Sequence, residues 1–115
     1  MLARTHRFHG YNSLRAVYVR GQTVRGAMMS LKYGQRSPHK TYRVGVVVSR
    51  KVSKSAVVRN RIRRRLYEII RKNLGGQAGG YDLVLTAYDE QLAELDHDKL
   101  EAMVLELLTK AGLVV

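Results

Sequence analysis

Ten of the chain's 21 lysine and arginine residues lie in residues 50–72, together with a single acid, Glu68. The apolar residues of this segment recur with the spacing of one helix face, and they are Val58, Ile62, Leu66, Ile69 and Ile70. A helix that buries this stripe exposes a dense and rigid array of positive charge. Arginine binds phosphate oxygens in a bidentate manner and also stacks on bases. The segment therefore predicts a helix that binds nucleic acid, with RNA favoured.

The helical period also predicts where the arginine side chains point. At about 100° per residue, Arg59 and Arg63 fall along one edge of the apolar stripe, and Arg61 and Arg65 fall along the other. Arg64 points directly outward. Like charges four residues apart destabilise a helix by roughly a few tenths of a kcal/mol per pair. Because an anionic partner relieves this repulsion, the pattern favours RNA binding over a merely solvated face.

Further residues extend the predicted interface. Arg50, Lys51 and Lys54 precede the helix, whose free N-terminal N–H groups also favour phosphate. Asn60 can hydrogen-bond to a base edge or to a ribose 2′-hydroxyl. We expect these residues to bind RNA together with the arginines of the helix.

The net charge of +12 is unevenly distributed along the chain. Residues 1–72 contain 19 basic residues and one acid, whereas residues 73–115 contain two basic and eight acidic residues. This asymmetry favours nucleic acid as the partner. An anionic membrane surface is the second candidate, but the basic helix lacks the exposed aromatic and leucine side chains that insert into lipid. We expect no membrane partner.

Composition limits the remaining classes of protein. The 115 residues, 45% of them hydrophobic, suit one domain over residues 1–115, with residues 1–10 as a flexible N-terminal segment. The absence of cysteine excludes disulfides and thiolate chemistry. The chain shows neither an apolar run long enough to span a membrane nor a secretory signal. We expect a cytoplasmic protein that needs no metal of its own, since the four histidines are scattered.

The sequence predicts seven helices and strands, with a loop and a linker between them, that position the basic residues. They are a helix over Leu14–Arg20, strands Thr23–Arg25 and Met28–Tyr33, a loop Gly34–Lys40, strand Tyr42–Val48, the basic helix Ser55–Asn73 capped by Ser55, strand Tyr81–Ala87 after the linker Gly75–Gly80, and helix Asp96–Lys110 ended by Gly112.

This αβββαβα order predicts an α/β (α+β) two-layer sandwich with one mixed, four-stranded sheet. The strands on either side of the basic helix form a β-α-β crossover and are expected to be parallel. The nearly continuous apolar run Tyr42–Val48 indicates a central strand covered on both faces.

The basic segment resembles the bacterial ribonuclease P protein family. The resemblance rests on the strand end Val48-Ser49-Arg50-Lys51 and the run Arg59-Asn60-Arg61-Ile62-Arg63-Arg64. The strand start Arg43-Val44-Gly45 and the N-terminal pair Arg7-Phe8 also match that family. The match in order and spacing runs from about Arg7 to Leu108.

The resemblance implies a fold like domain 2 of ribosomal protein S5, with a left-handed β-α-β crossover. It also implies the role of protein subunit in a ribonucleoprotein endonuclease that removes the 5′ leader of precursor tRNA. The catalytic groups would then lie on the RNA subunit, which would hold most of the Mg²⁺. The implied partners are this RNA and precursor tRNA, with no obligate protein partner. Arg59, Asn60, Arg61, Arg63 and Arg64 are the implied docking residues.

The family places the single-stranded leader in a cleft between the first helix and the sheet, which suits a groove with stacking rings and flanking charge. Its members usually have an aromatic residue at the position of Leu14 and often in the second strand. We expect the cleft to be lined by Arg7, Phe8, Tyr11, Leu14, Tyr18, Met29, Lys32 and Tyr33.

Two other functions are open on the sequence alone. A general RNA-binding or ribosomal-type module would carry the same basic helix but have no role in tRNA processing. A protein-only nuclease would need a convergent cluster of acids, and all but one of the acids lie in the C-terminal third.

Overall fold

The structure is a computed structural model that describes residues 21–35, 42–74 and 81–113. Its strands are β1 (Gln22–Arg25), β2 (Met29–Gln35), β3 (Arg43–Val48) and β4 (Tyr81–Ala87). Its helices are α2 (Ala56–Asn73), the short 3-10 helix η3 (Glu90–Ala93) and α3 (His97–Lys110). The predicted helix over 14–20, most of the loop over 34–40 and the linker over 75–80 lie outside the described residues.

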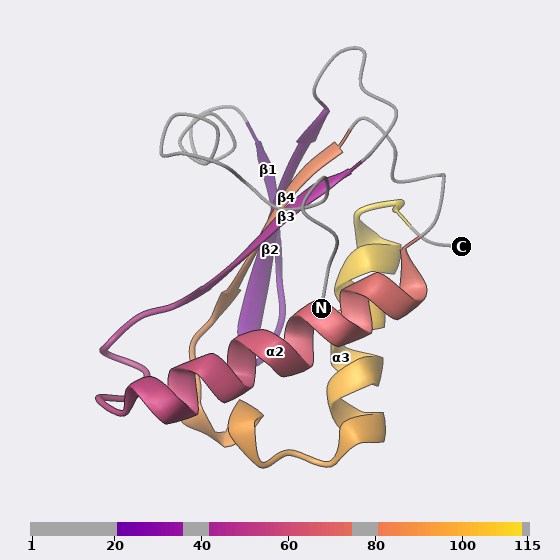
Figure 1. Cartoon of the computed structure of the whole chain (residues 1–115). Helices are drawn as coiled ribbons and strands as arrows, with labels where there is room; N and C mark the ends of the chain where they lie inside the picture. The colour runs from indigo at the N-terminus through magenta and orange to yellow at the C-terminus, as the bar shows by residue number, and fades with distance from the viewer. Residues whose placement is uncertain (1–20, 36–41, 75–80, 114–115) are drawn as a thin grey trace.

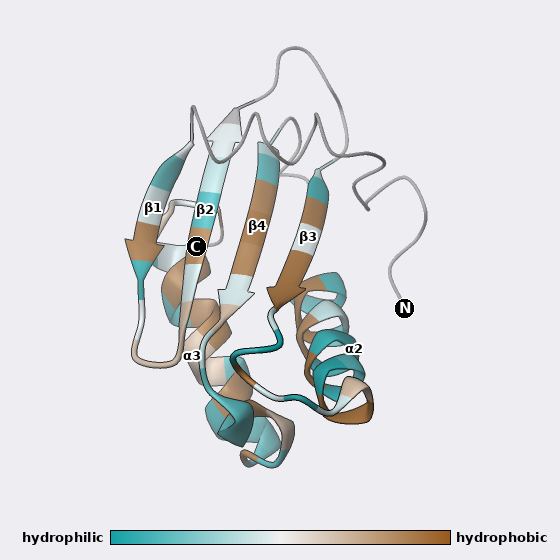
Figure 2. Ribbon diagram, turned by 90° about the vertical axis from the view of Figure 1, so that its left-hand side faces the viewer, coloured by the Kyte–Doolittle hydropathy of each residue, from teal (hydrophilic) through white to brown (hydrophobic). Residues whose placement is uncertain are grey.

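The four strands form one mixed sheet in the order β1-β2-β4-β3. The pairs β1/β2 and β2/β4 are antiparallel, and β3 pairs with β4 in parallel. The four strands lie side by side, and α2 and α3 form a second layer (Figures 1 and 2). The predicted two-layer fold and the β3-α2-β4 crossover are therefore confirmed. The left-handed sense of the crossover stays a prediction.

Strand β3 is at the edge of the described sheet, so the prediction of a central strand was wrong. Val44, Val46 and Val48 are buried, whereas Arg43 and the two residues between these valines are only half-buried. The strand therefore packs only one face against the helices. A run of β-branched residues is compatible with a strand buried on one face as well as with one buried on both, so the run did not distinguish the two cases. The inner strands are β2 and β4, and residues 82–85 of β4 are all buried.

The core lies between the sheet and the two helices. The apolar stripe predicted on α2 forms one side of it: Ile62, Leu66, Ile69 and Ile70 are at most 1% exposed, and Val58 packs at the margin. Burial of one such side chain contributes roughly 1.5–3 kcal/mol. The sheet supplies Leu31, Val44, Val46, Leu83 and Leu85, and α3 supplies Leu100, Val104, Leu107 and Leu108. This packing fixes which arginines of α2 point away from the sheet.

Local signals mark the start of α2 and both ends of α3, and among them the Ser55 cap and the stop at Gly112 were predicted. The Ser55 side chain accepts a hydrogen bond of 3.3 Å from Val58 N and caps α2. Asp96 caps α3 by accepting from Asp98 N, and Gly112, with φ of +77°, lies just past its end. Helix η3 had no counterpart in the sequence prediction.

Tyr67 of α2 contacts the outer edge of β3. Its hydroxyl lies 3.2 Å from the backbone nitrogen of Val46, which donates a hydrogen bond to it. The helix is thereby joined to the edge strand by a polar contact as well as by its apolar face.

Candidate nucleic-acid interface

The loop between β3 and α2 presents three basic side chains on a defined backbone. Val52 N donates to Ser49 O over 3.1 Å, which closes a turn directly after β3. The hydroxyl of the buried Ser53 accepts from the backbone of residue 55 over 3.2 Å. Arg50, Lys51 and Lys54 are exposed on this loop and make no hydrogen bond or ion pair within the described part of the chain. The residues predicted to extend the interface are thus available to a ligand.

Arginines on one edge of α2 are oriented by groups of the loop and of the helix. Arg59 donates to the backbone carbonyl of Ser53 over 2.9 Å. Arg63 donates to Asn60 Oδ1 over 2.6 Å and makes a longer contact of 3.4 Å with Val48 O. With its carbonyl oxygen accepting from Arg63, Asn60 still has both amide N–H groups to offer a ligand. An acceptor such as a base carbonyl or a phosphate oxygen suits it.

Arginines on the other edge face the segment that contains η3. Arg61 is half exposed and lies 3.2 Å from the carboxylate of Glu94, which is itself 75% exposed. Arg65 donates to two backbone carbonyls, those of Leu92 and Leu95. These contacts use both terminal nitrogens of Arg65 to hold the segment after β4. We therefore assign Arg65 a structural role in place of the RNA contact that the sequence suggested.

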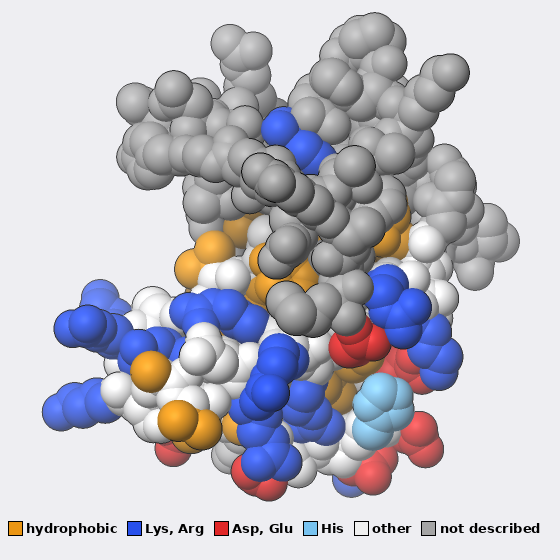
Figure 3. Space-filling view, in the orientation of Figure 1, with side chains coloured by type: hydrophobic (Ala, Val, Ile, Leu, Met, Phe, Trp, Pro, Cys, Tyr) orange, Lys and Arg blue, Asp and Glu red, His pale blue; other side chains and the backbone are white. Residues whose placement is uncertain are grey.

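The outward surface of α2 carries Arg64, which is exposed and makes no hydrogen bond or ion pair with a described residue. Among the described residues, a hollow of about 470 Å³ is lined by Val57, Asn60, Arg63, Arg64 and Tyr67. The Val57 side chain is 74% exposed beside these arginines. Figure 3 shows the basic side chains gathered over this part of the molecule. An apolar hollow bordered by guanidinium groups can accept both the base and the phosphate of a nucleotide.

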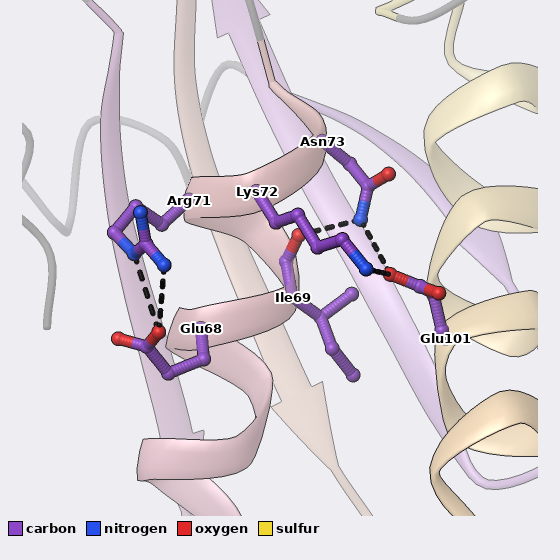
Figure 4. A network of polar contacts seen from close by, with 6 residues as sticks. All are labelled: Glu68, Ile69, Arg71, Lys72, Asn73 and Glu101. Atoms are coloured by element: carbon purple, nitrogen blue, oxygen red, sulfur yellow. Dashed lines mark hydrogen bonds and ion pairs between the residues drawn. The ribbon is translucent and has the colours of Figure 1, made fainter.

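Acidic partners neutralise the far end of α2 (Figure 4). Arg71 pairs with Glu68 over 3.0 Å, and Lys72 lies 3.6 Å from Glu101 of α3. The Asn73 amide donates to Glu101 Oε2 over 3.0 Å and to a backbone carbonyl one turn earlier. The hydrogen bond from Asn73, followed by the charge of Lys72, lowers the pKa of Glu101 below its ordinary value. The unpaired positive charge of α2 is therefore concentrated in its N-terminal half.

The strand period separates the residues that were predicted to line a single cleft. Met29 is 1% exposed and lies in the core, and the Tyr33 hydroxyl donates to Gln22 Oε1 over 3.0 Å on the same side of the sheet. Lys32 points to the opposite side, because successive residues of a strand alternate between faces. The expectation that all three line one cleft was wrong. The other predicted cleft residues, Arg7, Phe8, Tyr11, Leu14 and Tyr18, lie outside the described residues.

We call the side of the sheet turned away from α2 and α3 the distal face. The strand register places on it the polar residues Thr23, Arg25, Ser30, Lys32, Arg43, Asp82 and Thr86, together with the apolar Val47 and the buried Val84. Arg43 and Asp82 face each other on β3 and β4 in a bidentate pair, with distances of 2.9 Å and 2.8 Å. Their side chains are 17% and 6% exposed. Asp82 is the one acid on the strands of the described sheet, and this pairing neutralises it.

The described residues contain no cluster of three His, Cys, Asp or Glu side chains that could hold a metal ion. Nor does any helix within them have the length and apolar character required to cross a membrane. The surface formed by the N-terminal half of α2 and the loop before it presents cations, an amide donor and the exposed Val57, a combination that suits a polyanion.

Comparison with known proteins identifies the family. A family model described as Ribonuclease P matches residues 2–112, nearly the whole chain. The chain belongs to the ribonuclease P family. The ribonuclease P protein component of a Synechococcus strain is 39% identical over 119 residues, which cover 100% of this chain and 88% of that protein. That of a Pseudanabaena strain is 40% identical over 86 residues, covering 75% and 74% of the two chains.

Solved structures of ribonuclease P proteins share the fold. The RNase P protein of Staphylococcus aureus superposes with a TM-score of 0.81 at 18% identity, covering 96% of this chain and 98% of that one. The protein from Thermotoga maritima gives a TM-score of 0.76 at 22% identity, covering 90% and 96%. The family resemblance stated from the sequence is thus confirmed, and so is the mixed four-stranded α/β fold that these proteins share.

Sequence reasoning missed three features of this family member. The Arg43–Asp82 pair follows from the parallel register of β3 and β4, which places the two residues opposite each other. The anchoring contacts of Arg65 depend on η3, which carried no recognised signal. The exposed Tyr88 follows directly after the predicted strand Tyr81–Ala87, and its position in the chain gave no indication of its surroundings.

Proposed function

We propose that this chain is the protein subunit of a bacterial-type ribonuclease P, and that it assists removal of the 5′ leader from precursor tRNA in the cytoplasm. One observation carries the proposal beyond family membership. The N-terminal half of α2 and the loop before it present exposed cations that have no hydrogen-bond or ion-pair partner among the described residues, notably Arg50, Lys51, Lys54 and Arg64. Such cations supply the phosphate contacts that dominate affinity for nucleic acids.

The two sides of the molecule suit two different parts of an RNA assembly. The surface of α2, with Arg64 and the Asn60 amide, is proposed to dock on the folded RNA subunit. The distal face, with Arg25 and Lys32 on neighbouring strands and Asp82 neutralised, is proposed to receive the single-stranded leader. A strand of RNA laid on that face meets positive charge without an opposing free carboxylate on the sheet.

The hydrolytic groups are proposed to lie on the RNA subunit. The described residues offer no set of three ligating side chains, so no step is assigned to a metal ion held by this chain. Mg²⁺ bound by the RNA would supply activation of water and stabilisation of the leaving oxygen. The protein contributes binding energy and orientation, which lower the barrier when they hold the reacting groups in line.

Reconstitution with a bacterial ribonuclease P RNA tests the proposal. Cleavage of a precursor tRNA at low Mg²⁺ concentration is measured with the RNA alone and with RNA plus protein. We expect the protein to increase the rate and to favour leader-bearing tRNA over mature tRNA in binding. Absence of any stimulation refutes the proposed function.

Two further measurements separate the proposal from general RNA binding and from a protein nuclease. Equal affinity of the reconstituted complex for leader-bearing and leaderless tRNA would instead favour an RNA-binding module with no role in tRNA processing. Cleavage by the protein without RNA, dependent on one of its acids, would instead indicate a protein nuclease.

A further inference from the structure

Tyr88 is an exposed aromatic side chain directly after β4. It is 56% exposed, and Val57 is the only other large hydrophobic residue that is strongly exposed in the described part of the chain. The surface of α2 accounts for Val57, which lines the hollow there. Nothing in that interface uses Tyr88.

The Tyr88 ring is held in place at both ends. Its backbone N–H donates to Met28 O over 2.8 Å, which continues the ladder between β2 and β4. Its hydroxyl lies 2.7 Å from the hydroxyl of Ser30, and Ser30 is only 5% exposed. Since Ser30 belongs to the distal face, the ring reaches back over the end of that face. A ring fixed in this way loses little further conformational entropy when a ligand stacks on it.

Cations lie on both sides of this ring. On one side, Arg25 of β1 is paired in register with Ser30 and therefore shares its face. On the other side, β3 ends opposite Ala87, so the loop that carries Arg50 and Lys51 begins beside Tyr88. Arg25, Arg50 and Lys51 are exposed and have no hydrogen-bond or ion-pair partner among the described residues.

The acids that follow Tyr88 border the site on the remaining side. Asp89 Oδ1 accepts from Gln91 N over 2.9 Å and caps η3, and the exposed Glu90 comes next. Phosphate is repelled from this direction and attracted toward Arg25. An exposed, fixed ring beside unpaired cations is the arrangement with which proteins bind single-stranded nucleic acid.

We propose that Tyr88 is a stacking platform for one unpaired nucleotide of the precursor leader, and that Arg25 binds a phosphate next to that nucleotide. The identity of the RNA as leader rests on the proposed function. The stacking itself rests on the geometry of Tyr88, Ser30 and Arg25. Tyr88 is in this view a positioning residue, which fixes where the leader leaves the sheet.

Fluorescence of a tryptophan variant tests the stacking directly. The chain contains no tryptophan, so Tyr88→Trp introduces a single reporter. We expect its emission to be quenched when a short single-stranded RNA is added to the full-length protein. Tyr33→Trp is the matched control, because residue 33 lies on the helix side of the sheet and its emission should not change. Equal responses of the two variants, or no quenching at position 88, overturn the stacking.

Binding of tRNA by the reconstituted complex tests the assignment to the leader. Tyr88→Ala should weaken binding of leader-bearing tRNA by about 5- to 150-fold, the loss expected for one stacked base. Binding of leaderless tRNA should stay unchanged, and Tyr88→Phe should retain most of the affinity. The salt dependence should also stay unchanged for Tyr88→Ala, whereas Arg25→Ala should reduce its slope by about one phosphate contact.

The outcomes separate the two levels of the proposal. Wild-type affinity in Tyr88→Ala, with circular dichroism showing a folded protein, overturns the role of Tyr88 while leaving the proposed function intact. An equal loss for leader-bearing and leaderless tRNA overturns the leader as the occupant and places the RNA subunit there. Failure of the wild-type protein to distinguish the two tRNAs refutes the proposed function, and the fluorescence result still decides the stacking.

Discussion

Arg64 and Arg65 are neighbours on α2, and their environments predict opposite consequences of substitution. Arg64 is exposed and without a partner among the described residues, whereas Arg65 donates to the carbonyls of Leu92 and Leu95. Replacement of Arg64 by alanine should remove one phosphate contact and leave the fold intact. Replacement of Arg65 should release the η3 segment and leave the phosphate contacts in place.

The two magnitudes follow from these contacts. Hydrogen bonds that involve a charged group contribute roughly 1.5–3 kcal/mol each. Arg65 makes two such hydrogen bonds, but it is half-buried, and water can satisfy part of the lost hydrogen bonding in the variant. We therefore expect the free energy of unfolding to fall by about 2–4 kcal/mol in Arg65→Ala. Each phosphate contact contributes about 0.9 to the slope of log binding constant against log salt concentration. Arg64→Ala should lose one such contact, so the ratio of wild-type to variant affinity should fall by about 3.5-fold between 50 and 200 mM salt.

Two assays applied to both variants give the comparison. Urea denaturation reports the free energy of unfolding, and RNA binding across a salt series reports the number of phosphate contacts. The reasoning is refuted if Arg65→Ala lowers the salt slope without loss of stability. It is also refuted if Arg64→Ala leaves the slope unchanged, because the side chain would then face solvent in the complex.

Three further predictions concern the polar contacts around the core. Asp82→Asn should lower the free energy of unfolding by roughly 3–5 kcal/mol, because Arg43 would keep a buried charge with a weaker partner; urea denaturation checks this, and a near-neutral result would contradict it. The hydrogen bond from Asn73 lowers the pKa of Glu101 in the folded state. The ionised carboxylate therefore stabilises the fold fully at pH values above its unfolded pKa of about 4.3. This stabilisation is lost as the pH falls through the lower pKa of the folded state. Denaturation of wild type and Glu101→Gln should therefore differ at pH 7 and converge in strong acid, and a constant difference would oppose this. Glu94→Gln should modestly increase the affinity for RNA, because it removes the carboxylate that pairs with Arg61 on α2. Filter binding at low salt measures this affinity, and a weaker or unchanged value would contradict the prediction.

The sequence predicted the features that depend on local patterns. The stripe on α2 has the period of a helix, so the buried residues and both arginine rows followed from it. The Ser55 cap and the end of α3 near Gly112 also came from short-range signals. The family resemblance added the functional assignment, which charge alone leaves open between several RNA-binding proteins.

The errors arose where a side chain's role depends on a distant segment. Arg65 differs from its neighbours only because two carbonyls near η3 lie within its reach. The position of β3 at the sheet edge depends on strand order, which the valine-rich run does not encode. Met29 and Lys32 were assigned to one cleft by analogy, although the alternation of residues in a strand already places them on opposite faces.

The contact between Tyr67 and Val46 also bears on intermolecular strand pairing. An edge strand with unpaired N–H groups is a template on which another chain can add a strand. The Tyr67 hydroxyl occupies one of these groups on β3, and α2 lies against the same strand. The helix proposed to dock on RNA therefore also shields β3 from intermolecular pairing, so a variant that loosens α2 should show aggregation as well as weaker RNA binding.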